Sequence, residues 1–223
     1  MFKHKLTISD LLLILVNLVP LYGVWALNWD ARIVFLVYCM ETVIIGLANV
    51  LKMAVVTVFV RPKDNWESNG KITLQSGWFF ILFFIMHYGL FVFVQTQLFF
   101  GVSGLGKSGS FFGNYSQIPV LLGNEGKMLL LIFLLYYALQ TYFDFFANNR
   151  FRTISLNRLM FEPYIRIFIQ QLVVITGSIF LSFGAGKIFI LVFVVVKIGF
   201  EVMINYTVLW RKAKERAGTE SKN

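Results

Sequence analysis

Seven ionisable side chains of this sequence lie within, or at the edges of, apolar stretches that are long enough to cross a membrane. They are Glu41, Lys52, His87, Asp144, Arg166, Lys197 and Glu201. A charge at bilayer depth is costly, so such a side chain usually faces the interior of a helix bundle and has a partner there. Histidine and buried carboxylates can also titrate near neutral pH. These side chains can therefore transfer protons or ions, or form ion pairs between helices.

The stretch ETVIIGLANVLKM places its polar residues along one expected helix. Glu41 and Lys52 are eleven residues apart, which returns them to nearly the same helix face but ~16 Å apart along the axis. The two cannot pair with each other, so each needs a partner from another helix. Asn49 lies between them, where small side chains let another helix approach closely. We expect Glu41, Asn49 and Lys52 to line a polar interior.

The expected depth of each charged residue in the membrane indicates which other residues can pair. Asp144 and Arg166 lie near the same membrane face, so we expect an ion cluster of these two residues with Gln170, which is one turn from Arg166. Lys197 and Glu201 are four residues apart and can bond each other along one helix stripe. All of these side chains are also suited to clamping helices together, and Arg166 can extend to the headgroups.

His87 and Tyr88 lie near the middle of the next apolar stretch. Glu41 can contact His87, and with one more oxygen ligand these two are a weak candidate for a metal site. The sharper hypothesis is a proton or ion pathway past Glu41, His87, Lys197 and Glu201.

Common catalytic and cofactor patterns are not found in the sequence. His87 is the one histidine within an apolar stretch, whereas a haem with two histidine ligands needs a second. No HExxH zinc motif occurs, and the serines between 103 and 110 lie in a Gly-rich segment rather than on a helix that faces a histidine. No cofactor is therefore assigned, and we expect no enzyme.

The composition explains where these residues lie. Hydrophobic residues make up 58% of the 223 residues, 25 residues are phenylalanine, and the mean hydropathy is +0.73. No water-soluble domain fits these values, so the sequence predicts one integral membrane domain, 1–223. Runs this long cross lipid only as helices, because lipid offers the backbone no hydrogen bonds. We expect an all-α polytopic bundle of six transmembrane helices, at about 8–27, 33–58, 77–99, 129–146, 164–183 and 188–210.

The basic residues orient the expected helices. Thirteen lysines and arginines lie in the loops and tails on the side of the N-terminus, against four on the other side: Arg32, Lys107, Lys127 and Lys187. The positive-inside rule then places both termini in the cytoplasm (N-in/C-in), in the inner membrane of the cell. The net charge of +9 indicates contact with anionic lipid headgroups, not nucleic acid. Other membrane proteins, or further copies of this chain, are the remaining partner classes.

Three connections carry further expectations. The polar segment Arg61–Lys71 is expected to be a plain cytoplasmic link. The segment Asn148–Pro163 mixes basic and apolar residues, which predicts a helix at the headgroup level that ends at Pro163. The glycines of Gly101–Lys127 argue against regular structure there; a partly embedded cap over the bundle and an ordinary flexible loop both fit this segment.

The stretches ETVIIGLANVLKM, FFIMHYGLFVFVQTQLFF and PYIRIFIQQLVVITGSIF resemble an uncharacterised family of small prokaryotic membrane proteins, the domain of unknown function with the serial number 6498. The residues that carry the likeness are Glu41, Gly46, Asn49, Lys52 and Met53, followed by His87, Tyr88 and Gly89. The resemblance covers the second to the sixth expected helix. It implies a multi-pass membrane protein without an assigned activity, and it indicates no substrate, cofactor or partner.

Three function classes remain open. We expect a protein that moves protons, ions or a small solute through its polar interior. The alternative is a non-catalytic structural or accessory membrane subunit, which would use the same charges only to hold helices or to dock another membrane protein. An enzyme acting on lipid or quinone is the outsider, because no nucleophile–base pair or metal constellation occurs.

The expected orientation can be tested with a reporter enzyme that is active only in the periplasm. We predict no activity when the reporter is fused after Trp210, and strong activity when it is inserted within Gly104–Gly113, because the basic loops hold the first site in the cytoplasm. Immunoblots of both fusions control for expression. The opposite pattern would contradict N-in/C-in.

Overall fold

The computed structural model describes residues 8–68, 71–106, 111–164, 166–169, 171, 176–177, 180 and 183–200. This part of the chain is mostly helical, as the composition predicts. The helices are α1 (Ile8–Ala26), α2 (Ala31–Phe59), α3 (Gly77–Ser103), α4 (Phe111–Leu121), α5 (Gly123–Thr141) and α6 (Leu156–Phe161). Residues 186–200 form a further helix, which we call the 186–200 helix.

Three of the described helices are long and apolar enough to cross a membrane. They are α2, α3 and α5, the last together with the π-helical turn η1 (Tyr142–Ala147) that extends it. All three overlap spans that the sequence predicts. α1 contains a shorter apolar stretch, Leu11–Ala26. The expected spans 164–183 and 188–210 lie partly outside the described residues.

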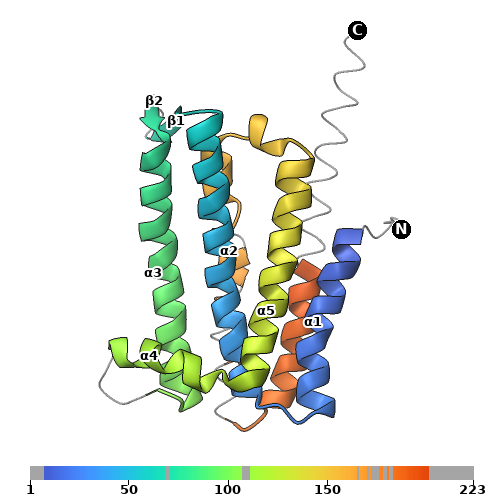
Figure 1. The fold of residues 1–223 in the computed structure, drawn as a ribbon. Coiled ribbons are helices and arrows are strands. Elements are labelled where there is room, and N and C mark those ends of the chain that lie inside the picture. Colours follow the sequence, from blue (N-terminus) through green and yellow to red (C-terminus); the bar gives the residue numbers. More distant parts are fainter. Residues whose placement is uncertain are drawn as a thin grey trace.

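The central helix is α2, which contacts α1, α3, α5 and α6 (Figure 1). Its 29 residues give a length of ~43 Å, about the thickness of a bilayer with its headgroups. Asp30 caps the start of α2, since its carboxylate accepts a hydrogen bond of 2.8 Å from the backbone N–H of Arg32. These four helices are therefore positioned against α2.

The core forms two clusters along α2. We call the end of the bundle beside α4 the α4 end, and the opposite end, where the two strands lie, the hairpin end (Figure 1). One cluster surrounds Phe35, whose ring centroid is 5.3 Å from that of Phe99 and 5.1 Å from that of Phe189. The second cluster, around Met53 and Phe84, also contains α6 residues. Buried aromatic pairs of this kind stabilise the packing beyond the area that they bury.

The polar link after α2 is a β-hairpin, not the plain loop expected for Arg61–Lys71. Strands β1 (Lys63–Ser68) and β2 (Lys71–Ser76) pair antiparallel over their full length. The Trp66 ring anchors the hairpin, with its centroid 5.6 Å from Phe79 and 5.8 Å from Phe80 of α3. The Asn-Gly dipeptide at 69–70 is a strong hairpin signal, which the interpretation based on polarity alone did not use.

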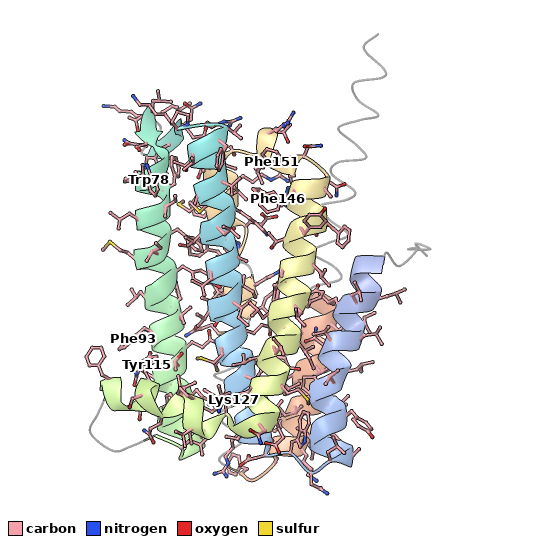
Figure 2. The ribbon with its side chains drawn as sticks, viewed as in Figure 1. Trp78, Phe93, Tyr115, Lys127, Phe146 and Phe151 are labelled. Carbon is pink, nitrogen blue, oxygen red and sulfur yellow. The ribbon has the colours of Figure 1, made fainter. Side chains whose placement is uncertain are left out.

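The Gly-rich segment Gly101–Lys127 contains α4, which lies across one end of the bundle (Figure 1). The expectation that glycines prevent regular structure was wrong for Phe111–Leu121, because Gly113 is the one glycine in that stretch. The Tyr115 ring stacks on Phe93 of α3, with centroids 6.0 Å apart and planes 17° apart (Figure 2). Of the two alternatives for this segment, the structure therefore shows a cap.

Helix α6, in the segment Asn148–Pro163 where the sequence predicts a helix at the headgroup level, packs its apolar side chains into the bundle. Leu156, Leu159 and Met160 are each 0% exposed. The Asn49 side-chain amide of α2 donates a hydrogen bond of 2.9 Å to the backbone carbonyl of Leu159. Because α6 is only six residues long, its backbone groups depend on such side chains for partners, and supplying them allows its apolar face to be buried.

Asp64 supplies the partner at the other end of α6. Its carboxylate accepts a hydrogen bond of 2.6 Å from the backbone N–H of Leu156, and its side chain is also paired with Arg61 at 3.4 Å. The residue is 8% exposed. The hairpin therefore helps to hold α6 in place through this carboxylate.

We predict that Asp64→Ala lowers the free energy of unfolding by ~1–2 kcal/mol, because the buried backbone N–H of Leu156 loses its acceptor. Thermal unfolding of the purified protein in detergent measures this effect. Asp144→Asn is the matched control: Asp144 is exposed, so we expect a change of no more than a few tenths of a kcal/mol. Equal effects of the two substitutions would contradict the anchoring role of Asp64.

Candidate functional site

The most buried charged group of the described chain is the carboxylate of Glu41 in α2, which is 1% exposed. The Lys197 ammonium of the 186–200 helix donates a hydrogen bond to Oε2 of this carboxylate and forms an ion pair with it. The Tyr137 hydroxyl of α5 donates to the other oxygen, Oε1, at 2.7 Å. One carboxylate thus joins three helices, and we call Glu41, Tyr137 and Lys197 the central site.

Aromatic rings enclose the ammonium of the central site. Lys197 Nζ lies 4.6 Å from the ring centroid of Tyr38 and 5.0 Å from that of Phe133. A cation over an aromatic face is stabilised by the ring quadrupole, more strongly where water is excluded. Lys197 is 6% exposed, so water is largely excluded from these contacts. The site is compact, and its positive and negative charges are balanced.

The structure gives Glu41 a different partner from the one expected, and it does not test the expected contact of Lys197 with Glu201. The expected partner of Lys197, Glu201, lies outside the described residues. Glu41 bonds Lys197, which is 156 residues away in the sequence, instead of contacting His87. Tyr137 was missed because tyrosine and phenylalanine occur throughout the apolar stretches, and 17% of the chain is aromatic.

The sequence analysis expected His87 to line the interior of the bundle. The structure instead places it at an exposed position of α3. Its Nδ1 is hydrogen-bonded to the Tyr164 hydroxyl at 2.8 Å, and its ring lies beside Phe83 and Phe91. The neighbouring Tyr88 does face inward, where its hydroxyl donates to the backbone carbonyl of Thr42 at 2.9 Å. Successive residues of a helix point ~100° apart, so only one of the two could face α2.

The candidate metal site of Glu41 and His87 is not formed, because the two side chains have these separate partners. Within the described residues, no group of three or more His, Cys, Asp or Glu side chains could hold a metal ion. Among the residues that the structure describes, the central site is therefore an ion pair with a hydrogen-bonded tyrosine.

A second polar cluster lies near the hairpin end, where the sequence predicts Asp144, Arg166 and Gln170. In this cluster Arg150 forms an ion pair with Glu162, with 2.7 Å between the guanidinium nitrogen and the carboxylate oxygen. Lys52 and Arg166 lie close enough to act electrostatically on Glu162. Asp144 is exposed, and Gln170 lies outside the described residues. We call Lys52, Arg150, Glu162 and Arg166 the basic cluster.

The charges of the basic cluster favour the ionised form of Glu162. Burial by itself raises the pKa of this carboxyl group, but the charge and hydrogen bond of Arg150, with the charges of Lys52 and Arg166, outweigh burial. The pKa of Glu162 is therefore lower than its ordinary value. The sequence analysis missed both partners of the recorded pair, because Arg150 and Glu162 lie in the segment that it assigned to a surface helix.

A cavity of about 270 Å³ opens at the α4 end. Its lining comes from the α1–α2 connection, the start of α2 and the start of α5, and it includes Asp30, Val34, Glu125 and Leu129. Beside it the Lys187 ammonium donates to Asn28 at 3.0 Å. Val34 precedes Glu41 by seven residues, so its backbone lies ~10 Å from that of Glu41 along α2.

The described part of the chain thus defines a class: a mostly helical protein with three helices suited to crossing a membrane, joined around a buried ion pair. The chain belongs to the family described as "Family of unknown function (DUF6498)", whose family model matches residues 1–221. The resemblance to this family that the sequence motifs indicate is confirmed. No curated protein and no solved structure matches the chain.

The stability of the central site can be tested with a double-mutant cycle. We predict that Lys197→Met lowers the free energy of unfolding by ~3–5 kcal/mol, because Glu41 is left buried without its cation. Adding Glu41→Gln should restore most of this loss, since no buried charge remains. Unfolding of the purified protein in detergent provides the measurement.

The exposed pair of Asp30 and Arg32 serves as the control for this cycle. Its side chains are 40% and 46% exposed, so Arg32→Met should cost ~1 kcal/mol or less. If Lys197→Met cost no more than Arg32→Met, the central ion pair would have to be solvated.

Proposed function

We propose that this protein is a multi-pass integral protein of the cell's cytoplasmic membrane, with six transmembrane helices and both termini inside, and that it moves protons through its interior. The three long apolar helices and the concentration of basic residues in the loops on one side support the topology. Glu41 and Lys197 are the residues that we assign to proton transfer.

One observation carries this proposal: an acid and a base, both almost fully buried, are in direct contact between different helices. Ionisable groups at this depth are rare and costly, and they commonly mark ion pathways and proton relays. The pair remains neutral as a whole when the proton passes from the ammonium to the carboxylate, so the low-dielectric interior opposes this step little. The Tyr137 hydroxyl, which donates to the same carboxylate, carries a further exchangeable proton.

Polar groups on either side of the central site outline a route along α2. The cavity at the α4 end reaches Val34, two turns from Glu41. Toward the hairpin end lie the Tyr88–Thr42 hydrogen bond and then Asn49, which precedes Lys52 by one turn. Lys197 is 6% exposed and its ammonium lies against two rings, and we infer that this burial favours protons over the other cargoes considered from the sequence.

A structural or accessory role is the second candidate, and one observation favours it. The ammonium packs against Tyr38 and Phe133, and Phe193 packs against Tyr38 at 4.3 Å between ring centroids. A pair held this tightly in apolar surroundings can act purely as a clamp that positions helices. In that case the partner would be another membrane protein or a further copy of this chain.

Proton flux into liposomes distinguishes the two functions. The purified chain is reconstituted with a pH-sensitive dye inside the vesicles, and a potassium gradient with valinomycin drives protons. We expect wild-type flux well above that of empty liposomes. Glu41→Gln combined with Lys197→Met should reduce flux to that background, because no titratable acid or base remains in the pair.

The double variant is chosen because it leaves no unpaired buried charge and should therefore stay folded. His87→Ala is the matched control: His87 lies on the exposed side of α3, so flux should be unchanged. Normal flux through the folded double variant would exclude this pair as the route. An absence of flux in the wild-type protein would favour the accessory role.

A further inference from the structure

Lys52 is a cation that forms no direct ion pair with the described part of the chain. Its side chain is half-buried on α2, and the described residues provide it with neither a hydrogen bond nor an ion pair. Seven residues separate it from Phe59, so it lies ~10 Å from the end of α2. An ammonium group that is partly removed from water needs a compensating negative charge.

The charged neighbours of Lys52 are of both signs, two acids and two arginines. The hydrogen bond between Asn49 and the Leu159 carbonyl brings α6 against α2 one turn before Lys52. Glu162 follows Leu159 by three residues and is engaged by Arg150 at 2.7 Å. The charges of Arg150 and Arg166 act on Lys52 together with those of Glu162 and Asp144.

The sum of these charges is positive. Lys52, Arg150 and Arg166 carry three positive charges, against two negative charges on Glu162 and the exposed Asp144. Glu162 already accepts a hydrogen bond from Arg150, so its charge only partly compensates Lys52. Arginine and lysine side chains together are the usual partners of phosphate oxygens, Arg through paired N–H donors and Lys as a point charge.

The depth of the basic cluster matches a lipid phosphate. α2 is ~43 Å long, whereas the hydrocarbon core of a bilayer is ~30 Å thick, so each end of α2 extends ~6 Å into the headgroup layer. Lys52 then lies just inside the hydrocarbon boundary, from which its long side chain can reach the phosphate level. Arg150 and Glu162 come from the segment that closes the bundle at this end.

From these contacts we propose that Lys52, Arg150 and Arg166 form a binding site for a phosphate group at the hairpin end of the bundle. The phosphate is supplied by an anionic phospholipid of the adjoining leaflet or by a soluble phosphate ion, which present the same oxygens to the site. The site is separate from the central site and does not depend on proton movement there.

Thermal unfolding of the full chain in neutral detergent tests the site. One arm compares added phosphatidylglycerol with added phosphatidylcholine, and the other compares phosphate with chloride buffer at equal ionic strength. In at least one arm the phosphate-bearing anion should raise the Tm of the wild-type protein by a few degrees, because it binds the folded state. A rise with phosphatidylglycerol identifies a lipid headgroup, and a rise with phosphate buffer identifies a soluble anion.

Lys52→Gln should lose most of that rise, measured against its own Tm without the probe. Lys127→Gln removes the same charge from an exposed position at the α4 end and should retain the full rise (Figure 2). If Lys52→Gln does not fold, Arg166→Gln is measured in the same way, with the same expected loss. No rise in either arm, or equal rises in the cluster variant and in Lys127→Gln, would overturn the proposal.

Discussion

Glu41 is a carboxylate inside an apolar bundle, and such a charge has to be neutralised by a partner that is equally buried. Its two oxygens are used separately: one accepts from Lys197, and the other accepts from Tyr137. Turning α2, α5 or the 186–200 helix by one residue would remove at least one of these contacts. Apolar helices in lipid have little other reason to prefer one register, so this contact determines how the three helices face one another.

The hairpin end meets a similar constraint with different groups. There the groups to be satisfied are backbone atoms of the short α6, and Asp64 and Asn49 supply their partners. Once both ends of α6 are bonded, Leu159 and its apolar neighbours can be buried against α2. Lys52 and two arginines lie beside this segment together with Glu162, whereas the central site pairs one acid with one base. The proton transfer that we propose rests on the balanced pair, and the phosphate site that we propose rests on the cations of the cluster.

The length and apolar character of the runs predicted α2, α3 and the α5 region, because a helix that can cross a membrane depends on its own residues alone. The β-hairpin had a usable signal in the Asn-Gly dipeptide. The burial of α6 had none, since its mixture of basic and apolar residues is equally typical of a helix on the membrane surface. His87 was placed wrongly because α3 is apolar on all sides, so its sequence does not indicate which face meets α2.

The sequence by itself therefore determined the class of the protein, its family and the fact that Glu41, Lys52 and Lys197 need partners. Those conclusions follow from composition, run length and the cost of burying charge, none of which requires knowing how helices pack. Only the tertiary structure decided that Lys197 forms an ion pair with Glu41 and that Lys52 lies near Arg150, Arg166 and Glu162. Such pairings depend on how helices that are far apart in the sequence are rotated and at what depth they lie. A local sequence pattern does not indicate either property.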